Sequence, residues 1–300
     1  MAEPARIYIG TSGWSYPKGE GTWRGYFYPR ARVNELEYYR RFFTTVEINS
    51  SFYRPPDPAR VHNWVRRVPR EFLFTVKLWQ KFTHPKMYQR ATGREAAISQ
   101  QDVDLFRSSL EPLVRHGKLG ALLAQFPPSF VNDAYGRQIL RAVIGTFAQY
   151  PLAVELRHRS WSDDRDTGRL LSESRVAWVQ VDEPKFSTSV AGDLPLTGDM
   201  AYFRFHGRNR EMWWRGDSES RYRYLYSPEE IVELSQRVRA AAKKARLTFA
   251  FFNNHWQGYA PRNATQMMQN LRLPFKDVPL EVVLPDEQEG GNYLASSGGE

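Results

Sequence analysis

The sequence predicts an α/β fold, a single (β/α)8 TIM barrel with eight parallel strands and a long loop after the seventh strand. Two observations carry this prediction. Short apolar runs alternate with longer stretches of helical spacing, and the runs are near-continuously apolar, as parallel strands covered on both faces are. Eight such units in roughly 270 residues also match the usual size of this barrel.

The expected strands are eight runs rich in β-branched and aromatic residues. They occupy residues 6–10, 45–49, 72–78, 120–126, 152–157, 176–182, 201–207 and 247–254. Helical patterns lie between them at 34–43, 102–116 and 227–245. The last of these opens with Ser227 at the N-cap and Glu230 three residues later, which is the sequence signature of a capping box.

One barrel domain is expected over residues 6–280, after an N-terminal tail of residues 1–5. Residues 281–300 are acidic and rich in Gly and Ser, and we expect them to be disordered. Residues 207–226 form a long connection after the seventh strand. Loops of this length in a compact domain are usually functional or disordered.

Composition indicates an anionic partner. The chain has 42 Lys and Arg against 33 Asp and Glu, a net charge of +9. Arginine predominates, and its planar guanidinium suits bidentate contact with phosphate or carboxylate. A GC-rich genome would raise the arginine count equally well. We therefore expect an anionic ligand, either a phosphorylated small molecule or a nucleic acid.

Several classes of protein are excluded or disfavoured. The chain has no cysteine, which excludes disulfides, thiolate catalysis and cysteine-ligated metals. No apolar run reaches the ~18 residues that a membrane span needs, so no membrane partner is expected. The N-terminus lacks a basic region followed by an apolar one, so no signal peptide is predicted. These features favour a cytoplasmic location.

The polar residues of the strand runs gather at one end, where a barrel of this kind places its active site. In the second run, Val46 and Ile48 share one face of the strand, and Glu47 and Asn49 share the other. If the apolar pair packs on helices, Glu47 and Asn49 point into the mouth of the barrel. The same reasoning predicts that one cavity is lined by Glu47, Asn49, Lys77, Glu155, Arg157, Asp182, Arg204, His206 and Asn253.

Two interpretations of this charged mouth stay open, an active site or a self-neutralised ion-pair network that only closes the barrel. In the first, Glu47 or Glu155 is a general acid or base and His206 a proton shuttle. The catalytic candidates are Glu47, Glu155, His206 and Asp182. The candidates for substrate binding are Ser12, Trp14, Asn49, Tyr53, Lys77, Gln125, Arg157, Arg204, Arg208, Asn253 and Asn254. Among these, Arg157, Arg204 and Lys77 would form an anion clamp.

No cofactor and no metal are expected. His84, His158, His206 and His255 follow strand runs, but no two histidines have the spacing of HxH or HExxH. The segment "GTSG" at 10–13 has two glycines and two hydroxyls after a strand. It could form an anion-binding nest or simply a tight turn.

The loop 207–226 interleaves five arginines with five aromatic residues. They are Arg208, Arg210, Arg215, Arg221 and Arg223, with Trp213, Trp214, Tyr222, Tyr224 and Tyr226. Such a mixture suits stacked bases and phosphates, another phosphate-bearing ligand, a sugar platform, or a structural lid.

Several segments together resemble the YecE-like family, a domain of unknown function (number 72) of TIM-barrel proteins. They are "GTSGWSY", "VEINSSFYR", "FTVKLWQKFTH", "AQFPPSF", "VELRHRSW", "VDEP", "YFRFHGRN" and "FFNNH". The resemblance implies a TIM barrel and a kinship of shape with apurinic-endonuclease and xylose-isomerase barrels, and through them a link to nucleic acid. It implies no reaction. Ser51 stands where the family pattern has Thr, a conservative departure.

Three functions are therefore carried forward. The first is an enzyme, a hydrolase or lyase with Glu/His acid–base chemistry, acting on a phosphate-bearing or nucleic-acid substrate. The second is a carbohydrate-active enzyme using a carboxylate pair, here Glu47 and Glu155. The third is a non-catalytic nucleic-acid-binding barrel. The small number of histidines at the strand ends does not support metal-dependent phosphodiester cleavage.

Overall fold

The computed structural model describes residues 6–215 and 218–278. Within them, strands and helices alternate along the chain, and every strand pairing is parallel. The predicted α/β fold with parallel strands is therefore confirmed. The expectations for the tails 1–5 and 281–300 lie outside the described residues.

The strands form two parallel sheets. One has the order β1-β9-β8-β7 and the other the order β2-β3-β4-β5-β6. The strand bounds are β1 Arg6–Thr11, β2 Thr45–Ile48, β3 Leu73–Lys77, β4 Leu119–Gln125, β5 Leu152–Glu155, β6 Ala177–Trp178, β7 Gln180–Asp182, β8 Met200–Phe205 and β9 Leu247–Phe252.

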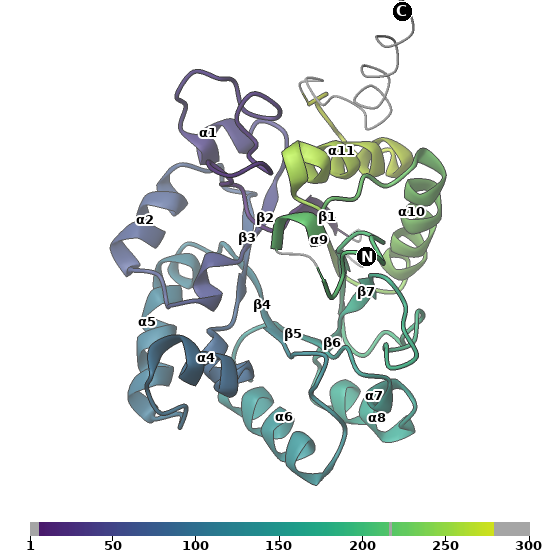
Figure 1. Cartoon of the computed structure of the whole chain (residues 1–300). Coiled ribbons are helices and arrows are strands. Elements are labelled where there is room, and N and C mark those ends of the chain that lie inside the picture. Colours follow the sequence, from purple (N-terminus) through teal and green to yellow (C-terminus); the bar gives the residue numbers. More distant parts are fainter. Residues whose placement is uncertain (1–5, 216–217, 279–300) are drawn as a thin grey trace, which may run out of the picture.

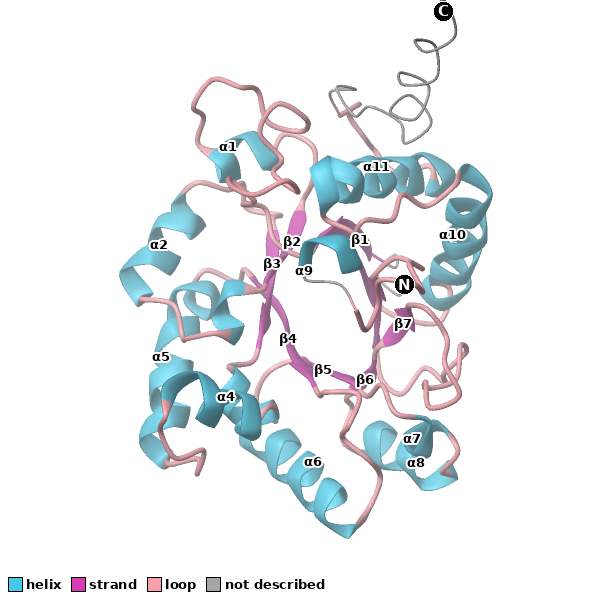
Figure 2. Cartoon of the chain, viewed as in Figure 1, coloured by secondary structure: helices cyan, strands magenta, loops and turns pink. Residues whose placement is uncertain are grey.

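The two sheets meet at both of their edges. The expected strand 176–182 is divided into β6 and β7 at Val179, whose N–H donates to the carbonyl of Val154 at 3.0 Å. At the other edge, β1 and β2 are joined by an isolated bridge between Ser12 and Glu47. Figure 2 shows the strands standing around a ring with the helices outside them.

The helices surround the strands, and several begin at the signals that the sequence shows. Ser227 and Glu230 form the predicted capping box, with Ser227 N–H donating to the Glu230 carboxylate at 2.9 Å. The bounds are α1 Glu35–Tyr39, α2 Pro58–Arg66, α3 Gln80–Thr83, α4 Pro85–Thr92, α5 Gln100–Arg115, α6 Ala134–Thr146, α7 Arg159–Ser162, α8 Arg165–Glu173, α9 Ser218–Arg221, α10 Pro228–Ala242 and α11 Tyr259–Leu271. Short 3-10 turns cover Ser50–Phe52 and Trp256–Gly258.

The apolar core has two parts, one on each face of the strands. Val46 and Ile48 belong to the larger cluster, which lies between strands and helices. The smaller cluster, which includes Leu123 and Tyr202, fills the space inside the ring. The alternation predicted for the second strand run is thus confirmed, and Glu47 is directed to the inner side, where it contacts Tyr202.

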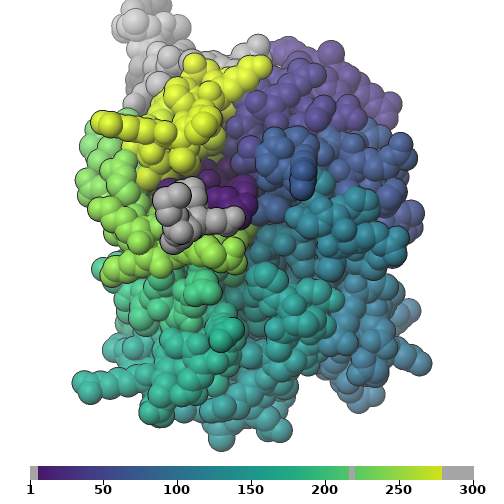
Figure 3. Space-filling view, turned by 180° about the vertical axis from the view of Figure 1, so that it is seen from behind, coloured from purple at the N-terminus to yellow at the C-terminus, as the bar shows by residue number. Residues whose placement is uncertain are grey.

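The two ends of the ring differ. In Figure 1, α9 from the loop 207–226 lies across the ring at the near end. Figure 3, seen from behind, shows the first described residues in purple near the middle of the opposite face. Because β1 begins at that far face, the near end holds the carboxyl ends of the strands, where the predicted site residues lie.

Candidate active site

Arg204, at the end of β8, is the centre of a buried ion-pair network. Its Nε and Nη2 donate to the two carboxylate oxygens of Glu47 at 3.1 and 2.7 Å, in bidentate geometry. Its Nη1 donates to Glu155 Oε2 at 2.7 Å. All three side chains are at most 1% exposed. Tyr202 Oη also donates to Glu47, at 2.7 Å, so this carboxylate is fully occupied.

A second arginine extends the network from β5. Arg157 Nε donates to Glu155 Oε1 at 2.5 Å, and its Nη1 lies 3.3 Å from Glu183 Oε2. Burial opposes ionisation of Glu155, but Arg157 and Arg204 hold its pKa well below the ordinary value. Glu155 is therefore an anion at neutral pH, since two guanidinium groups compensate its desolvation.

His206 lies within this network as a neutral ring. Burial, and then Arg157 and Arg204, lower the pKa of His206 to about 3. Arg157 Nη2 lies 2.9 Å from His206 Nε2, and a guanidinium has only donors, so Nε2 accepts. The proton is then on Nδ1, 2.9 Å from the side-chain amide of Asn253. A half-turn of that amide gives Nδ1 its acceptor.

Asp182 belongs to a separate cluster behind the loop 207–226. It accepts from Arg208 Nη2 at 2.7 Å and from Tyr226 Oη at 2.8 Å. Arg208 also contacts Glu230 and Glu233. Asp182 is thus paired with residues of the loop 207–226. Among the residues that the structure covers, no contact joins Asp182 to Glu47 or Glu155.

A cleft of about 950 Å³ opens beside the network at the carboxyl ends of the strands. Four of the predicted residues form its inner end together with Arg204, and Trp14 and Tyr53 lie along its wall. The four are Asn49, Lys77, Gln125 and Asn253. Glu47, Glu155, Arg157 and His206 are not among the lining residues and lie behind Arg204. The predicted cavity is therefore divided into an open cleft and a buried network.

Lys77 is a basic residue of the mouth that has no carboxylate partner among the described residues. It ends β3, and its Nζ lies 4.1 Å from the centre of the Phe52 ring. No carboxylate oxygen of the described residues lies within 4.0 Å of this Nζ. Burial, and then the neighbouring Arg204, lower the pKa of Lys77 to about 7. A large fraction of this amine is therefore uncharged at neutral pH.

The outer wall of the cleft is basic and comes from the segments after β1 and β2. It includes the exposed Arg24, Arg32 and Arg60, with Glu35 as the acidic lining residue. Arg60 stands over the Trp64 ring at 5.4 Å. These arginines were not among the predicted site residues, because they lie neither at a strand end nor in the loop 207–226.

A signal for this wall was present in α2. Arg60, Asn63, Trp64 and Arg67 recur at the spacing i, i+3, i+4 and i+7, which places polar and aromatic side chains on one face of a helix. All four line the cleft. Such a stripe on the helix that follows the second strand would have located the wall from the sequence alone.

Three buried polar atoms at the cleft have no hydrogen-bond partner among the described residues. They are Ser12 Oγ, Asn49 Oδ1 and His255 Nδ1. Asn49 and His255 line the cleft, and Ser12 precedes the lining residue Gly13. Buried polar groups are normally paired, so these atoms call for water or a ligand.

The segment "GTSG" is a tight turn. The N–H groups of Ser12 and Gly13 donate to the carbonyls of Phe252 and Glu47 at 2.9 and 2.8 Å. An anion-binding nest needs free N–H groups, which are absent at these two residues.

The loop 207–226 packs as a lid over the strand ends. Trp213 and Tyr226 are buried in it, and Arg221 and Arg223 stand over the rings of Trp213 and Trp256. Four of the five arginines of this loop contact the protein itself, as expected of a structural lid: Arg208, Arg210, Arg221 and Arg223.

Two further predicted residues have contrasting positions. Asn254 is buried away from the cleft, with its amide donating to Tyr224 O and Asn263 Oδ1 at 2.9 and 2.8 Å. Tyr53 is 70% exposed at the cleft rim. Asn254 therefore stabilises the lid and α11, whereas Tyr53 offers an open aromatic face.

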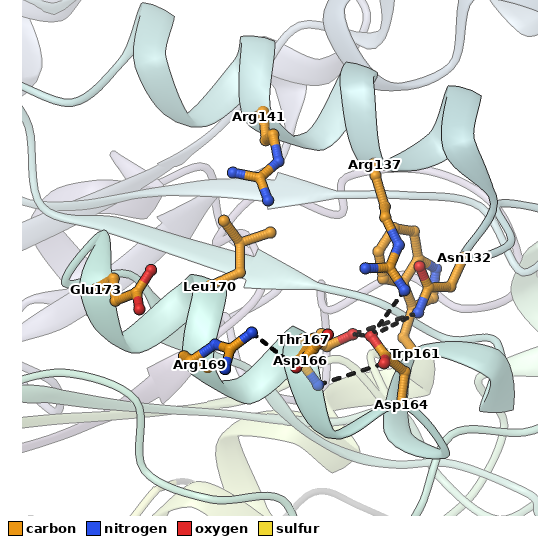
Figure 4. A pocket seen from close by; sticks show the side chains of 10 residues that line it. All are labelled: Asn132, Arg137, Arg141, Trp161, Asp164, Asp166, Thr167, Arg169, Leu170 and Glu173. Carbon is orange, nitrogen blue, oxygen red and sulfur yellow. Dashed lines mark hydrogen bonds and ion pairs between the residues drawn. The ribbon is translucent and has the colours of Figure 1, made fainter.

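A second hollow, of about 110 Å³, lies between α6 and α8 (Figure 4). Asp164 accepts there from Asn132, Thr167 and Arg137 at 2.9, 2.8 and 3.2 Å. It also caps the N-terminus of α8. These contacts hold the helix start in place, so this hollow is structural.

Within the described residues, no group of three His, Asp or Glu side chains is arranged to hold a metal ion. No described helix is long and apolar enough to cross a membrane.

Fold and site define an α/β protein of parallel strands with a charged cleft at the strand ends. The chain belongs to the DUF72 family, a protein family of unknown function, whose model matches residues 8–289. The resemblance to YecE-like proteins is thereby confirmed.

Relatives from several bacteria match the chain. The UPF0759 protein YunF of Bacillus subtilis is 31% identical over 281 residues, 90% of this chain and 96% of YunF. UPF0759 protein YecE of Escherichia coli is 29% identical over 126 residues, 41% of this chain and 39% of YecE. The crystal structure of a DUF72 family protein from Thermotoga maritima is 36% identical with a TM-score of 0.77, covering 89% of this chain and 99% of that one.

Proposed function

We propose that the protein is an enzyme that binds a small phosphate-bearing substrate in the cleft at the strand ends. The observation that carries the proposal is the composition of this cleft. Exposed arginines form its outer wall, and Lys77 and Asn49, whose Oδ1 has no hydrogen-bond partner among the described residues, lie at its inner end. Its volume of about 950 Å³ is of the size that small-molecule sites have.

The proposal includes a closed barrel. The bridge between Ser12 and Glu47 joins the two sheets at one edge. At the other edge, β6 and β7 follow each other along the chain through Val179, which extends the pairing with β5 by its hydrogen bond to Val154. In such a barrel the loops after the strands form the active site, which agrees with the position of the cleft.

The carboxylate-pair alternative finds little support. A glycosidase acid needs a raised pKa, whereas Arg157 and Arg204 hold the pKa of Glu155 low. Glu47 is likewise saturated by Arg204 and Tyr202. We assign the buried network to a supporting role, in which it holds Arg204 at the cleft floor.

Single-stranded nucleic acid is the second candidate, and one observation favours it. Tyr53 at the rim is 70% exposed and offers an aromatic face in a cleft whose wall also carries exposed arginines. Stacking on aromatic residues next to arginines is how many proteins hold unpaired bases.

The test is isothermal titration calorimetry with glycerol 3-phosphate, glycerol and an oligothymidylate. We expect glycerol 3-phosphate to bind and glycerol not to bind. Arg60→Gln should weaken binding about ten-fold or more, since a hydrogen bond to a charged group contributes roughly 1.5–3 kcal/mol. Arg90→Gln, an exposed change on α4, is the matched control and should have no effect.

Two outcomes would redirect the proposal. Equal binding by wild type, Arg60→Gln and the triple variant Arg24→Gln/Arg32→Gln/Arg60→Gln would remove the outer wall from the site. Tight, salt-sensitive binding of the oligothymidylate, without binding of glycerol 3-phosphate, would favour the nucleic-acid candidate.

A further inference from the structure

We propose that Lys77 is an amine nucleophile that forms an imine with the carbonyl group of a phosphorylated aldehyde or ketone bound in the cleft. The inference rests on the proposed function, because the cleft wall would hold the phosphate while Lys77 meets the carbonyl carbon. It adds the reaction class and assigns Lys77 a covalent role in place of the anion clamp.

The position of Lys77 is that of a side chain facing a substrate. It ends β3 at the inner end of the cleft, and its backbone is fixed because Ser51 Oγ donates to its carbonyl at 2.7 Å. Phe52, from the turn after β2, places its ring 4.1 Å from Nζ. The amine therefore lies on a rigid strand end and beside an apolar wall.

The electrostatic surroundings favour the neutral amine. The charged groups around Lys77 are Arg204, Arg157, Glu155 and Glu47. His84, on the helical segment that follows β3, is a further titratable neighbour. The two carboxylates are paired with the two arginines, so neither is free to hold an ammonium group. A lysine that is desolvated and adjacent to another cation is activated as a nucleophile.

The other buried or half-buried basic side chains near Lys77 are paired with carboxylates. Arg157, Arg204 and Arg208 each pair with a carboxylate within 3 Å. Lys81 pairs with Asp102 at 2.8 Å. Lys77 thus differs from these neighbours because it has no carboxylate partner among the described residues and also lines the cleft.

The step is balanced without an oxidant or a cofactor. The Nζ lone pair attacks the carbonyl carbon, and the electrons of the C=O π bond move to oxygen. Both protons of the neutral amine are transferred to that oxygen, which leaves as water when the C=N bond forms. Once protonated, the imine draws electrons from the adjacent carbon, which is the chemistry of lysine-dependent carbonyl enzymes.

The experiment traps the imine with sodium cyanoborohydride, using glyceraldehyde 3-phosphate as probe and peptide mass spectrometry to locate the adduct. Unphosphorylated glyceraldehyde tests the phosphate requirement. Lys77→Arg keeps a long basic side chain but removes the nucleophilic amine. Lys77→Met removes both the base and the nucleophile, and it is the second variant in case one fails to fold. Lys185→Arg is the matched control, since burial also lowers the pKa of Lys185 but Lys185 does not line the cleft.

We expect one dominant adduct, on Lys77, that is lost in both Lys77 variants and retained in Lys185→Arg. The rate of trapping should rise about ten-fold between pH 6 and pH 8 and then level off, because a pKa near 7 is titrated there. An ordinary surface lysine would gain about 100-fold over the same interval without levelling off.

The outcomes separate the two proposals. Binding of glycerol 3-phosphate in calorimetry without any adduct on Lys77 overturns the imine inference and leaves the proposed function. If the adduct on Lys77 forms at the same rate with both aldehydes, the imine inference is supported and phosphate recognition by the cleft is excluded. Adducts confined to surface lysines, with no binding of glycerol 3-phosphate, overturn both.

Discussion

At the scale of single residues, the site is governed by what Arg204 and Arg157 do to their neighbours. Two buried guanidinium groups lower the pKa of Glu155 and occupy both carboxylates beside Lys77, and burial together with these groups lowers the pKa of His206 and of Lys77. Side-chain parity along the strands predicted that these residues meet. It did not show which carboxylates would be saturated, since that depends on bidentate geometry between strands far apart in sequence.

Arg204→Met should be strongly destabilising. It leaves Glu47 and Glu155 buried without their shared partner, and breaking a buried ion pair in this way costs about 3–5 kcal/mol. Denaturant unfolding measures the loss. Arg115→Met, which breaks the exposed pair with Glu111, is the control and should cost under about 1 kcal/mol. Similar losses in both variants would contradict the central role of Arg204.

Acid should destabilise the protein between about pH 6.5 and pH 4. Burial lowers the pKa of His84, His206 and His255 to about 3, 3 and 4. The unfolded state binds these protons below about pH 6.5 and the native state does not, so each histidine removes up to about 1.4 kcal/mol per pH unit as pH falls. Glu183, whose pKa burial raises, acts in the opposite direction.

Urea unfolding at pH 7, 6 and 5 measures this dependence. His255→Gln should reduce the slope by about 1 kcal/mol per pH unit, averaged over this interval. Glu155 does not contribute in this window, because a lowered carboxyl pKa is felt only below its unfolded value of about 4.3. Constant stability from pH 7 to pH 5 would show that the histidines are not neutral in the native state.

At the scale of elements, the sequence predicted the order and type of the strands well. Apolar runs and the capping boxes of α5 and α10 depend on residues that are close together in the chain, so they can be recognised from the sequence. The division of the sixth strand at Val179 was not predictable, because no proline or glycine marks it. The short bridge between β1 and β2 depends on a contact between segments about 35 residues apart.

Gly10 permits that contact. A Cβ at Gly10 would overlap the carbonyl oxygen of Thr45 on β2, so Gly10→Ala must push the two strands apart. We expect a loss of about 1–3 kcal/mol in unfolding free energy, the range for overpacked sites. Gly145→Ala, at an exposed position of α6 with no neighbour within 4 Å, should instead stabilise by about 0.5–1 kcal/mol. Equal effects would show that β1 and β2 are not closely packed there.

At the scale of the whole molecule, charge is divided between a neutralised interior and a basic cleft. The sequence indicated an anionic ligand from net charge, with the strand ends and the loop 207–226 as candidate sites. In the structure, exposed arginines from the segments after β1 and β2 line the cleft, whereas Arg208 of the loop is paired with Asp182. Net charge gives no position, and the pairing of each arginine emerges only from the folded chain.

The most direct test of the central claim is a crystal structure of the protein with glycerol 3-phosphate at saturating concentration. We expect density in the cleft, with the phosphate within hydrogen-bond distance of Arg24, Arg32 or Arg60 and the carbon chain directed toward Lys77. An empty cleft, or density bound at the loop 207–226 instead, would contradict the account.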